Sequence, residues 1–183
     1  MATPARRRAS NPALIAYIRP EAVASRIIKR HAEGAHDVAR RLLVEELCER
    51  GPAHRYELAV NLAQHALDSL AAVRARAEAE GLSWTVALPD PATGALVTIA
   101  DAGSTGAGMA VRLLDAMHRS QGGQLEADRD AAEVQEEAMG AEPAVLAAFL
   151  TALTAFAARA SHGGAVSGHA LPGGFAPSRP DPR

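Results

Sequence analysis

The stretch AHRYELAVNLAQHALDSLAAVRARAEAE, residues 53–80, decides the fold. Apolar side chains recur in it every three or four residues, which is the spacing of one face of an α-helix. The residues that share this face are Tyr56, Val60, Ala63, Leu67 and Leu70. Gly81 follows directly and is a typical helix stop. The pattern predicts one long helix, which we expect to be the spine of the fold.

Two shorter helices are predicted before this spine. Pro20 suits the first turn of a helix over 20–33, and the apolar face of that helix consists of Val23, Ile27 and Ile28. A second helix over 37–50 stops at Gly51-Pro52. The apolar stripe of the second helix consists of Val38, Leu42, Leu43 and Leu47. Cys48 extends this stripe, so we expect it to be a buried small hydrophobic residue rather than a reactive nucleophile.

The clearest strand signal lies beyond the spine. Trp84, Val86 and Leu88 alternate with smaller side chains, and residues 96–100 form a second apolar run. A turn that contains prolines and a glycine separates the two runs. We therefore predict one β-hairpin over about 83–100.

Three more helical segments follow the hairpin. A helix over 106–120 and an acidic helix to about Met139 precede an apolar helix over 143–160. The most apolar part of the last helix is shorter than the ~20 residues that a membrane span needs. We therefore expect a buried helix and no membrane partner. Its large side chains are expected in the core or in a homodimer interface: Leu146, Phe149, Leu150 and Leu153.

Together these elements predict a predominantly helical α+β domain over residues 20–161, with a helical core and one hairpin. The length of 183 residues suits a single domain. Residues 1–19 form a basic N-terminal arm, and residues 162–183, rich in glycine and proline, are expected to be a disordered tail. No targeting segment is convincing, so we expect a cytoplasmic protein.

Charge and cysteine content exclude several classes of protein. The formal net charge is -2, so the chain has no overall basic field for nucleic acid. A single cysteine excludes an internal disulfide framework and a cysteine-based zinc site. Residues 1–30 are basic, whereas residues 121–142 are acidic. We favour two solvated surfaces that attract each other; a nucleic-acid-binding arm over 6–30 is the alternative.

The histidines do not predict a metal site. His31 and His36 are five residues apart, whereas a zinc pair on one helical face needs a spacing of four. We therefore expect both to be surface histidines. His162 and His169 lie in the tail without a third ligand beside them.

A glycine-rich segment, DAGSTGAG at residues 101–108, joins the second predicted strand to a helix. A glycine turn before a helix start presents backbone N–H groups, which many proteins use to hold phosphate. The segment contains no lysine and matches neither of the common phosphate motifs, GxxxxGK[ST] and GxGxxG. Two interpretations stay open: a connector of small residues, which we favour, and a phosphate site.

The order of several motifs resembles a known family. ELAVNLAQHA at residues 57–66 lies on the long helix, Asp101-Ala102-Gly103 ends the hairpin, and Gly106-Ala107-Gly108 opens the next helix. This order is similar to that of GHKL (Bergerat-fold) ATP-binding domains, of the anti-sigma-factor serine kinase type. The resemblance covers roughly residues 39–137.

The resemblance implies ATP and Mg²⁺ as ligands. Asn61 would be the metal ligand, and Glu57 would be the catalytic base if the chain were an active kinase. Asp101 and Gly103 would contact adenine, and Gly106 and Gly108 the phosphates. The hairpin would belong to a larger GHKL-like sheet, to which residues 131–134 would add a strand. A second register, counted from residues 39–51, puts Leu62 and Ala66 at the Glu and Asn positions and would abolish metal-dependent catalysis.

We expect a small cytoplasmic regulatory or protein-interaction module without catalytic activity, whose protein partner the sequence does not identify. One alternative is a degenerate GHKL-like regulator that binds a nucleotide. A second alternative is a helical protein that binds nucleic acid through residues 6–30. Apart from ATP and Mg²⁺ in the first alternative, no cofactor or metal is expected. The sequence leaves enzymatic activity open and favours its absence.

Overall fold

The computed structural model describes residues 19–80, 83–85, 87–89, 95–161 and 176–178. Within these residues the chain is predominantly helical with a small β part, which confirms the predicted α+β class. The helices begin and end close to the predicted positions: α1 (Pro20–Ala32), α2 (His36–Glu49), α3 (Pro52–Ala79), α4 (Gly106–Gln121), α5 (Leu125–Gly140) and α6 (Pro143–Ser161).

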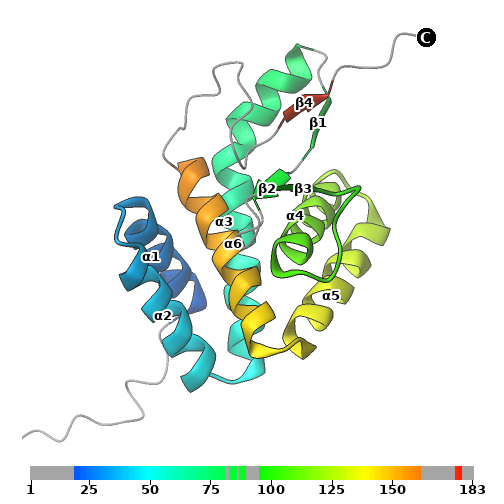
Figure 1. The fold of residues 1–183 in the computed structure, drawn as a ribbon. Coiled ribbons are helices and arrows are strands. Elements are labelled where there is room, and N and C mark those ends of the chain that lie inside the picture. Colours follow the sequence, from blue (N-terminus) through cyan, green and yellow to red (C-terminus); the bar gives the residue numbers. More distant parts are fainter. Residues whose placement is uncertain (1–18, 81–82, 86, 90–94, 162–175, 179–183) are drawn as a thin grey trace, which may run out of the picture.

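Two helix pairs flank a central pair (Figure 1). The long helix α3 and the apolar helix α6 lie side by side at the centre. α1 and α2 pack on one side of them, and α4 and α5 pack on the other. Gly34 and Gly123 have φ angles of 78° and 83°, so they allow the tight turns that join α1 to α2 and α4 to α5.

The core lies where α1, α3, α4 and α6 meet. The predicted apolar face of α1 is confirmed, since its three large side chains are buried. The predicted face of α3 is partly wrong: Leu58 and Leu62 are fully buried, whereas Tyr56 is 37% exposed. Nearly every turn of α3 carries several apolar residues, so the helices packed beside it decide which of them are buried.

The β part differs from the single predicted hairpin. β2 (Ala87–Pro89) and β3 (Leu96–Thr98) form a short antiparallel hairpin in which Leu88 faces Val97. β1 (Ser83–Thr85) instead pairs with β4 (Ala176–Ser178), in the segment for which the sequence predicts disorder. The hairpin is therefore shorter than 83–100, because its first three residues pair with a distant part of the chain. Residues 162–175 and 179–183 of the tail lie outside the described residues.

The described strands form two separate two-stranded sheets. Residues 131–134, which a larger GHKL-like sheet would need as a strand, are helical and belong to α5. The sequence favours this outcome, since alanine and glutamate are good helix formers.

The large side chains of α6 lie in the core. Leu146, Phe149, Leu150 and Leu153 are at most 4% exposed. By length and composition α6 could cross a membrane, and half of its 18-residue apolar window is buried inside the molecule. Of the two predicted roles, core and homodimer interface, the structure assigns these four residues to the core.

Candidate functional site

The glycine-rich loop after β3 is held by close packing. Thr105 caps α4, because its side-chain oxygen accepts a hydrogen bond of 3.1 Å from the Gly108 backbone N–H. Gly106 is buried against α6, where a Cβ atom would lie 2.6 Å from the Cβ of Ala148. A Cβ atom on Gly108 would collide with the backbone of Gly103. Packing within the chain therefore explains both glycines of the Gly-x-Gly pattern.

A carboxylate lies beside this loop. Glu137 of α5 accepts a hydrogen bond from the Ser104 hydroxyl and another, of 2.7 Å, from Nη1 of Arg112. These hydrogen bonds lower the pKa of Glu137 below its usual value, so the side chain is negatively charged at neutral pH. Arg112 is paired with this carboxylate, so the positive charge beside the loop is already used within the chain. The geometry therefore favours a connector over a phosphate site.

Two more residues assigned by the GHKL resemblance, Asn61 and Asp101, form hydrogen bonds within the chain. The amide of Asn61 donates a hydrogen bond of 2.7 Å to the backbone carbonyl of Glu57. The carboxylate of Asp101 is exposed and accepts a hydrogen bond of 2.9 Å from the Thr98 hydroxyl. Gly103 is exposed as well. Within the described ranges no hydrogen bond or ion pair joins Asn61 to Asp101, and nucleotide binding by these residues stays a prediction.

The acidic helix α5 is balanced by arginines of α4. Arg119 contacts Asp130 at 2.8 Å and Asp115 at 2.9 Å, and these hydrogen bonds raise the pKa of Arg119. α1 and α5 lie on opposite sides of the central pair (Figure 1). The predicted attraction between basic and acidic segments is therefore not seen between α1 and α5. Residues 1–18 of the basic arm lie outside the described residues.

The face formed by α1 and α2 is less completely packed. α2 buries only Ala39 and Leu43, while Val38 is 41% and Val44 is 47% exposed. Leu42 and Leu47 are half-buried. The single apolar stripe predicted for this helix is therefore partly wrong. α2 lies at the edge of the molecule (Figure 1), so only one narrow line of its side chains reaches the core.

The prediction for Cys48 is wrong as well. The sequence predicts a buried residue, but the cysteine is exposed near the C-terminal end of α2. Next to it, polar contacts hold α2 to α3: Oε2 of Glu46 and Nε2 of His54 lie 2.6 Å apart. Leu47, the neighbour of Cys48, is half-buried against the core, so Cys48 lies just outside the side of α2 that the core covers.

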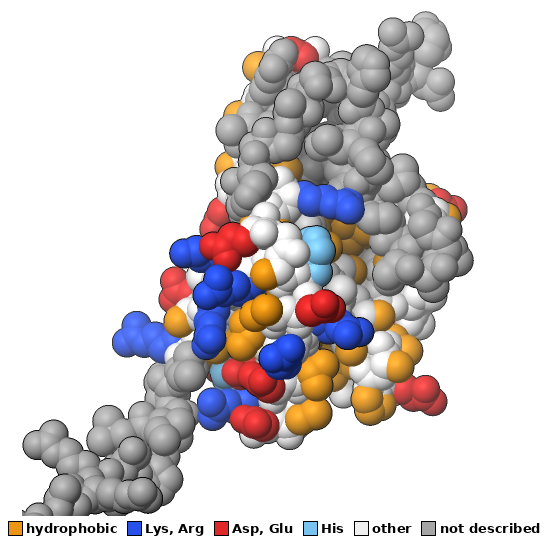
Figure 2. Space-filling view, turned by 60° about the vertical axis from the view of Figure 1, so that its left-hand side comes forward, with side chains coloured by type: hydrophobic (Ala, Val, Ile, Leu, Met, Phe, Trp, Pro, Cys, Tyr) orange, Lys and Arg blue, Asp and Glu red, His pale blue; other side chains and the backbone are white. Residues whose placement is uncertain are grey.

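Basic residues do not form a continuous patch on this face. Figure 2 shows Lys and Arg side chains interspersed with Asp and Glu side chains and with hydrophobic ones. On α1, Lys29 and Arg30 both pair with Glu33, at 4.0 Å and 2.9 Å. The nucleic-acid alternative for residues 6–30 stays a prediction, since most of the arm lies outside the described residues.

A cavity of about 280 Å³ lies between the α1–α2 corner and α6. Its lining combines imidazole, charged, apolar and hydroxyl side chains: His31, His36, Asp37, Ala39, Arg40, Leu43, Thr151 and Thr154. The rings of His31 and His36 meet edge to face with their centroids 4.4 Å apart. The two histidines predicted at the surface are thus brought together, His31 half-buried and His36 exposed.

Burial lowers the pKa of His31 below its usual value, and the nearby His36 and Arg159 lower it further. His31 is therefore neutral at pH 7. Within the part of the chain that the structure describes, no three His, Cys, Asp or Glu side chains are grouped as metal ligands would be. The histidine pair forms one wall of the cavity.

The sequence contains a signal for this pair that the helical spacing argument misses. A separation of five residues is wrong for two ligands on one helix, but Gly34 lies between them. A glycine with positive φ ends one helix and lets the next begin, so flanking side chains from two helices can face each other. His31 in the last turn of α1 and His36 at the start of α2 meet in this way.

The cavity and the α2 surface are two features of the described residues that packing of the core does not explain. Comparison with known protein families, curated proteins and solved structures found no match to this chain.

Proposed function

We propose that this chain is a small protein-interaction module, without catalytic activity, that binds a partner protein through the outer side of α2. The observation that carries the proposal is the exposed apolar surface of this helix. Val38, Val44 and Cys48 are all exposed, although the other side of α2 packs on α1 and α6. Exposed apolar side chains grouped on one surface are typical of sites where another protein docks.

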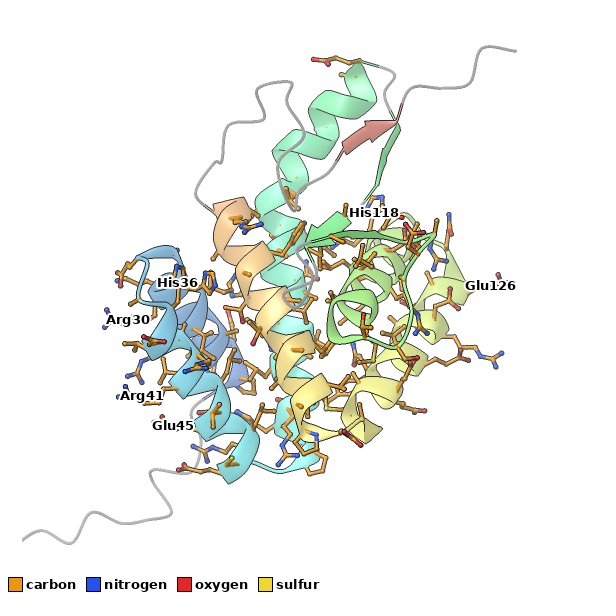
Figure 3. All side chains as sticks on the ribbon, in the orientation of Figure 1. Arg30, His36, Arg41, Glu45, His118 and Glu126 are labelled. Atoms are coloured by element: carbon orange, nitrogen blue, oxygen red, sulfur yellow. The ribbon has the colours of Figure 1, made fainter. Side chains whose placement is uncertain are left out.

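Charged side chains divide this surface into two apolar strips. Arg41 and Glu45 are four residues apart and point away from the molecule (Figure 3). Val38 and Leu42 lie on one side of this charged ridge; Val44 and Cys48 lie on the other. We call these six residues the α2 face. Apolar strips beside opposite charges suit an amphipathic helix of the partner, with apolar residues against the strips and complementary charges along the ridge.

The single cysteine allows a direct test. A photo-crosslinker attached to Cys48 lies on the α2 face and labels a protein that docks there. The labelled protein is then purified, and its affinity is measured by isothermal titration calorimetry. We expect Val44→Asp to weaken binding about tenfold or more, which is ~1.4 kcal/mol.

Leu125→Asp is the matched control. Leu125 is 87% exposed on α5, on the other side of the molecule, so the same change there should alter affinity less than about twofold. Equal binding by Val44→Asp and the unchanged chain would contradict the proposal. If the labelled protein is a second copy of this chain, light scattering will show a dimer that Val44→Asp dissociates.

The alternative function, a degenerate GHKL-like regulator that binds a nucleotide, leads to a different expected result. It predicts that ATP with Mg²⁺ binds and that Asp101→Ala abolishes this binding. Titration calorimetry of both proteins distinguishes the two functions. An affinity for ATP that is lost in Asp101→Ala would replace the proposed function and justify a kinase assay.

A further inference from the structure

The charges of the α2 face are arranged symmetrically about the middle of the helix. Leu43 lies near the middle of α2 and is 4% exposed, so the opposite side of the helix points outward at this level. Arg41 lies two residues before Leu43, and Glu45 lies two residues after it. Both charged side chains are exposed and point away from the molecule (Figure 3). The outer side of α2 therefore carries a positive and a negative charge at equal distances from its middle.

The apolar side chains of the α2 face follow the same symmetry. Leu42 and Val44 are the two neighbours of Leu43. Val38 and Cys48 lie five residues before and five residues after Leu43. The two members of each pair lie on different sides of the charged ridge, because a helix turns by about 100° per residue. Reversing the direction of α2 therefore exchanges every position of the α2 face with its pair.

Most other charges of α2 are paired within the chain. The carboxylate of Asp37 lies 3.9 Å from the guanidinium of Arg40. The carboxylate of Glu46 lies 2.6 Å from Nε2 of His54. Among the described residues, neither charge of the ridge is in an ion pair. An arginine four residues before a glutamate is also the less favourable order for pairing within one helix. Both charges of the ridge are therefore available to another molecule.

We propose that the partner of the α2 face is a second copy of this chain, whose α2 lies antiparallel on the first. In this arrangement Arg41 of each copy faces Glu45 of the other. Leu42 and Val44 pack against their counterparts beside the two-fold axis. The inference rests on the proposed function, since it names the protein that docks on the same surface.

The charges of the ridge disfavour a parallel pair of helices. A parallel pair would bring Arg41 next to Arg41 of the second copy and Glu45 next to its Glu45, and like charges at short distance repel each other. The antiparallel order turns both contacts into attractions. One like-charge contact remains at each end, where Asp37 is level with Glu49 of the second copy. Both of these side chains are exposed, so salt and water screen their repulsion.

The antiparallel order also separates the two cysteines. Cys48 lies five residues from the middle of α2, so the cysteines of the two copies are about 15 Å apart along the helix axis. A disulfide needs Cα atoms within about 7 Å of each other. We therefore expect a dimer without a disulfide between the copies, whereas a parallel pair would place the two cysteines at the same level.

The test is sedimentation velocity of the full chain with a reducing agent. A contact of one helix on each copy is small and the dimer is weak, so the chain is measured at up to about 1 mM. We expect Arg41→Glu and Glu45→Arg each to weaken dimerisation at least about tenfold, because both attractions become repulsions. A 1:1 mixture should restore dimerisation to within about threefold of the unchanged chain, because one variant then carries two acids and the other two arginines along the ridge.

Arg129→Glu is the matched control. It changes the net charge as Arg41→Glu does, but it lies on α5, on the other side of the molecule, with a side chain that is 82% exposed. We expect it to alter dimerisation less than about twofold. Circular dichroism checks that each variant is folded.

Three results would overturn the inference. A chain that stays monomeric at this concentration would exclude a second copy as the partner, whereas Val44→Asp with the protein captured through Cys48 would still test the proposed function. A mixture no more dimeric than the separate variants would show that the ridge does not join the copies. Rapid linkage of the two Cys48 thiols on oxidation of the dimer would show a parallel pair.

Discussion

α2 and α4 are helices of similar length with very different packing. α4 has 16 residues and buries nine of them, whereas α2 has 14 residues and buries two. α4 is covered by α5, α6 and the β2–β3 hairpin, while α2 rests on α1 and α6 at the edge of the molecule. The difference indicates that packing around α4 stabilises the fold, whereas α2 leaves side chains available to other molecules.

The glycines at the start of α4 lie in the tightly packed region. The Gly-x-Gly pattern at the start of α4 is needed because α6 and the preceding loop approach the backbone closely. In contrast, the α1–α2 corner carries no phosphate-like motif, and its cavity is formed by side chains from both helices and α6. A glycine pattern at a helix start is therefore weak support for a phosphate site unless the space beside it is open.

The largest expected effect on the free energy of unfolding tests the difference in burial between α4 and α2. Leu113 of α4 is fully buried, and Leu113→Ala should lower the free energy of unfolding by about 2–5 kcal/mol, because it removes apolar contacts and leaves a cavity. Val44→Ala on α2 should change it by less than about 0.5 kcal/mol. Urea unfolding followed by circular dichroism measures both. Similar losses of unfolding free energy in Leu113→Ala and Val44→Ala would contradict the difference in packing between α4 and α2.

A smaller effect tests the two glycines of the loop. Gly106→Ala places a Cβ atom 2.6 Å from Ala148 and should cost about 1–3 kcal/mol through overpacking. Gly103→Ala meets no atom within 4 Å and should be neutral within about 0.5 kcal/mol. Thermal unfolding of the two variants compares them. If Gly106→Ala were as stable as the unchanged chain, α6 would have to lie farther from α4 than described.

The smallest effect concerns the ion pair between α4 and α5. Glu137→Gln removes the charge held by Ser104 and Arg112 and should cost less than about 1 kcal/mol, since one third of the side chain is exposed. The folded-state pKa of Glu137 is lowered, so its contribution is present at neutral pH and is lost as pH falls through that lowered pKa.

Melting temperatures at pH 7 and at pH 3 measure this contribution. The difference between Glu137→Gln and the unchanged chain should shrink at the lower pH. Glu136→Gln is the control, because it removes one carboxylate from an exposed neighbouring position on α5. A difference that stays constant with pH would show that Glu137 does not act through its charge.

The helices were predictable because their signals are local. Pro20, Gly51-Pro52 and the glycines at 122 and 123 mark helix boundaries, and apolar spacing marks the buried faces of α1 and α4. The hairpin was only partly predictable. The sequence pattern indicates extended chain correctly for residues 83–85 and 87–88, but it cannot show that β1 pairs with residues 176–178, far away in the sequence.

By itself, the sequence determined which segments are helical, where they end, and that the domain is mainly helical, because backbone propensity and periodicity act within a few residues. Only the tertiary structure decided which apolar residues are buried. It made Cys48 and Val44 surface residues, buried Gly106, and joined His31 to His36 across a turn. Burial depends on which helices lie next to one another, and no local pattern contains that information.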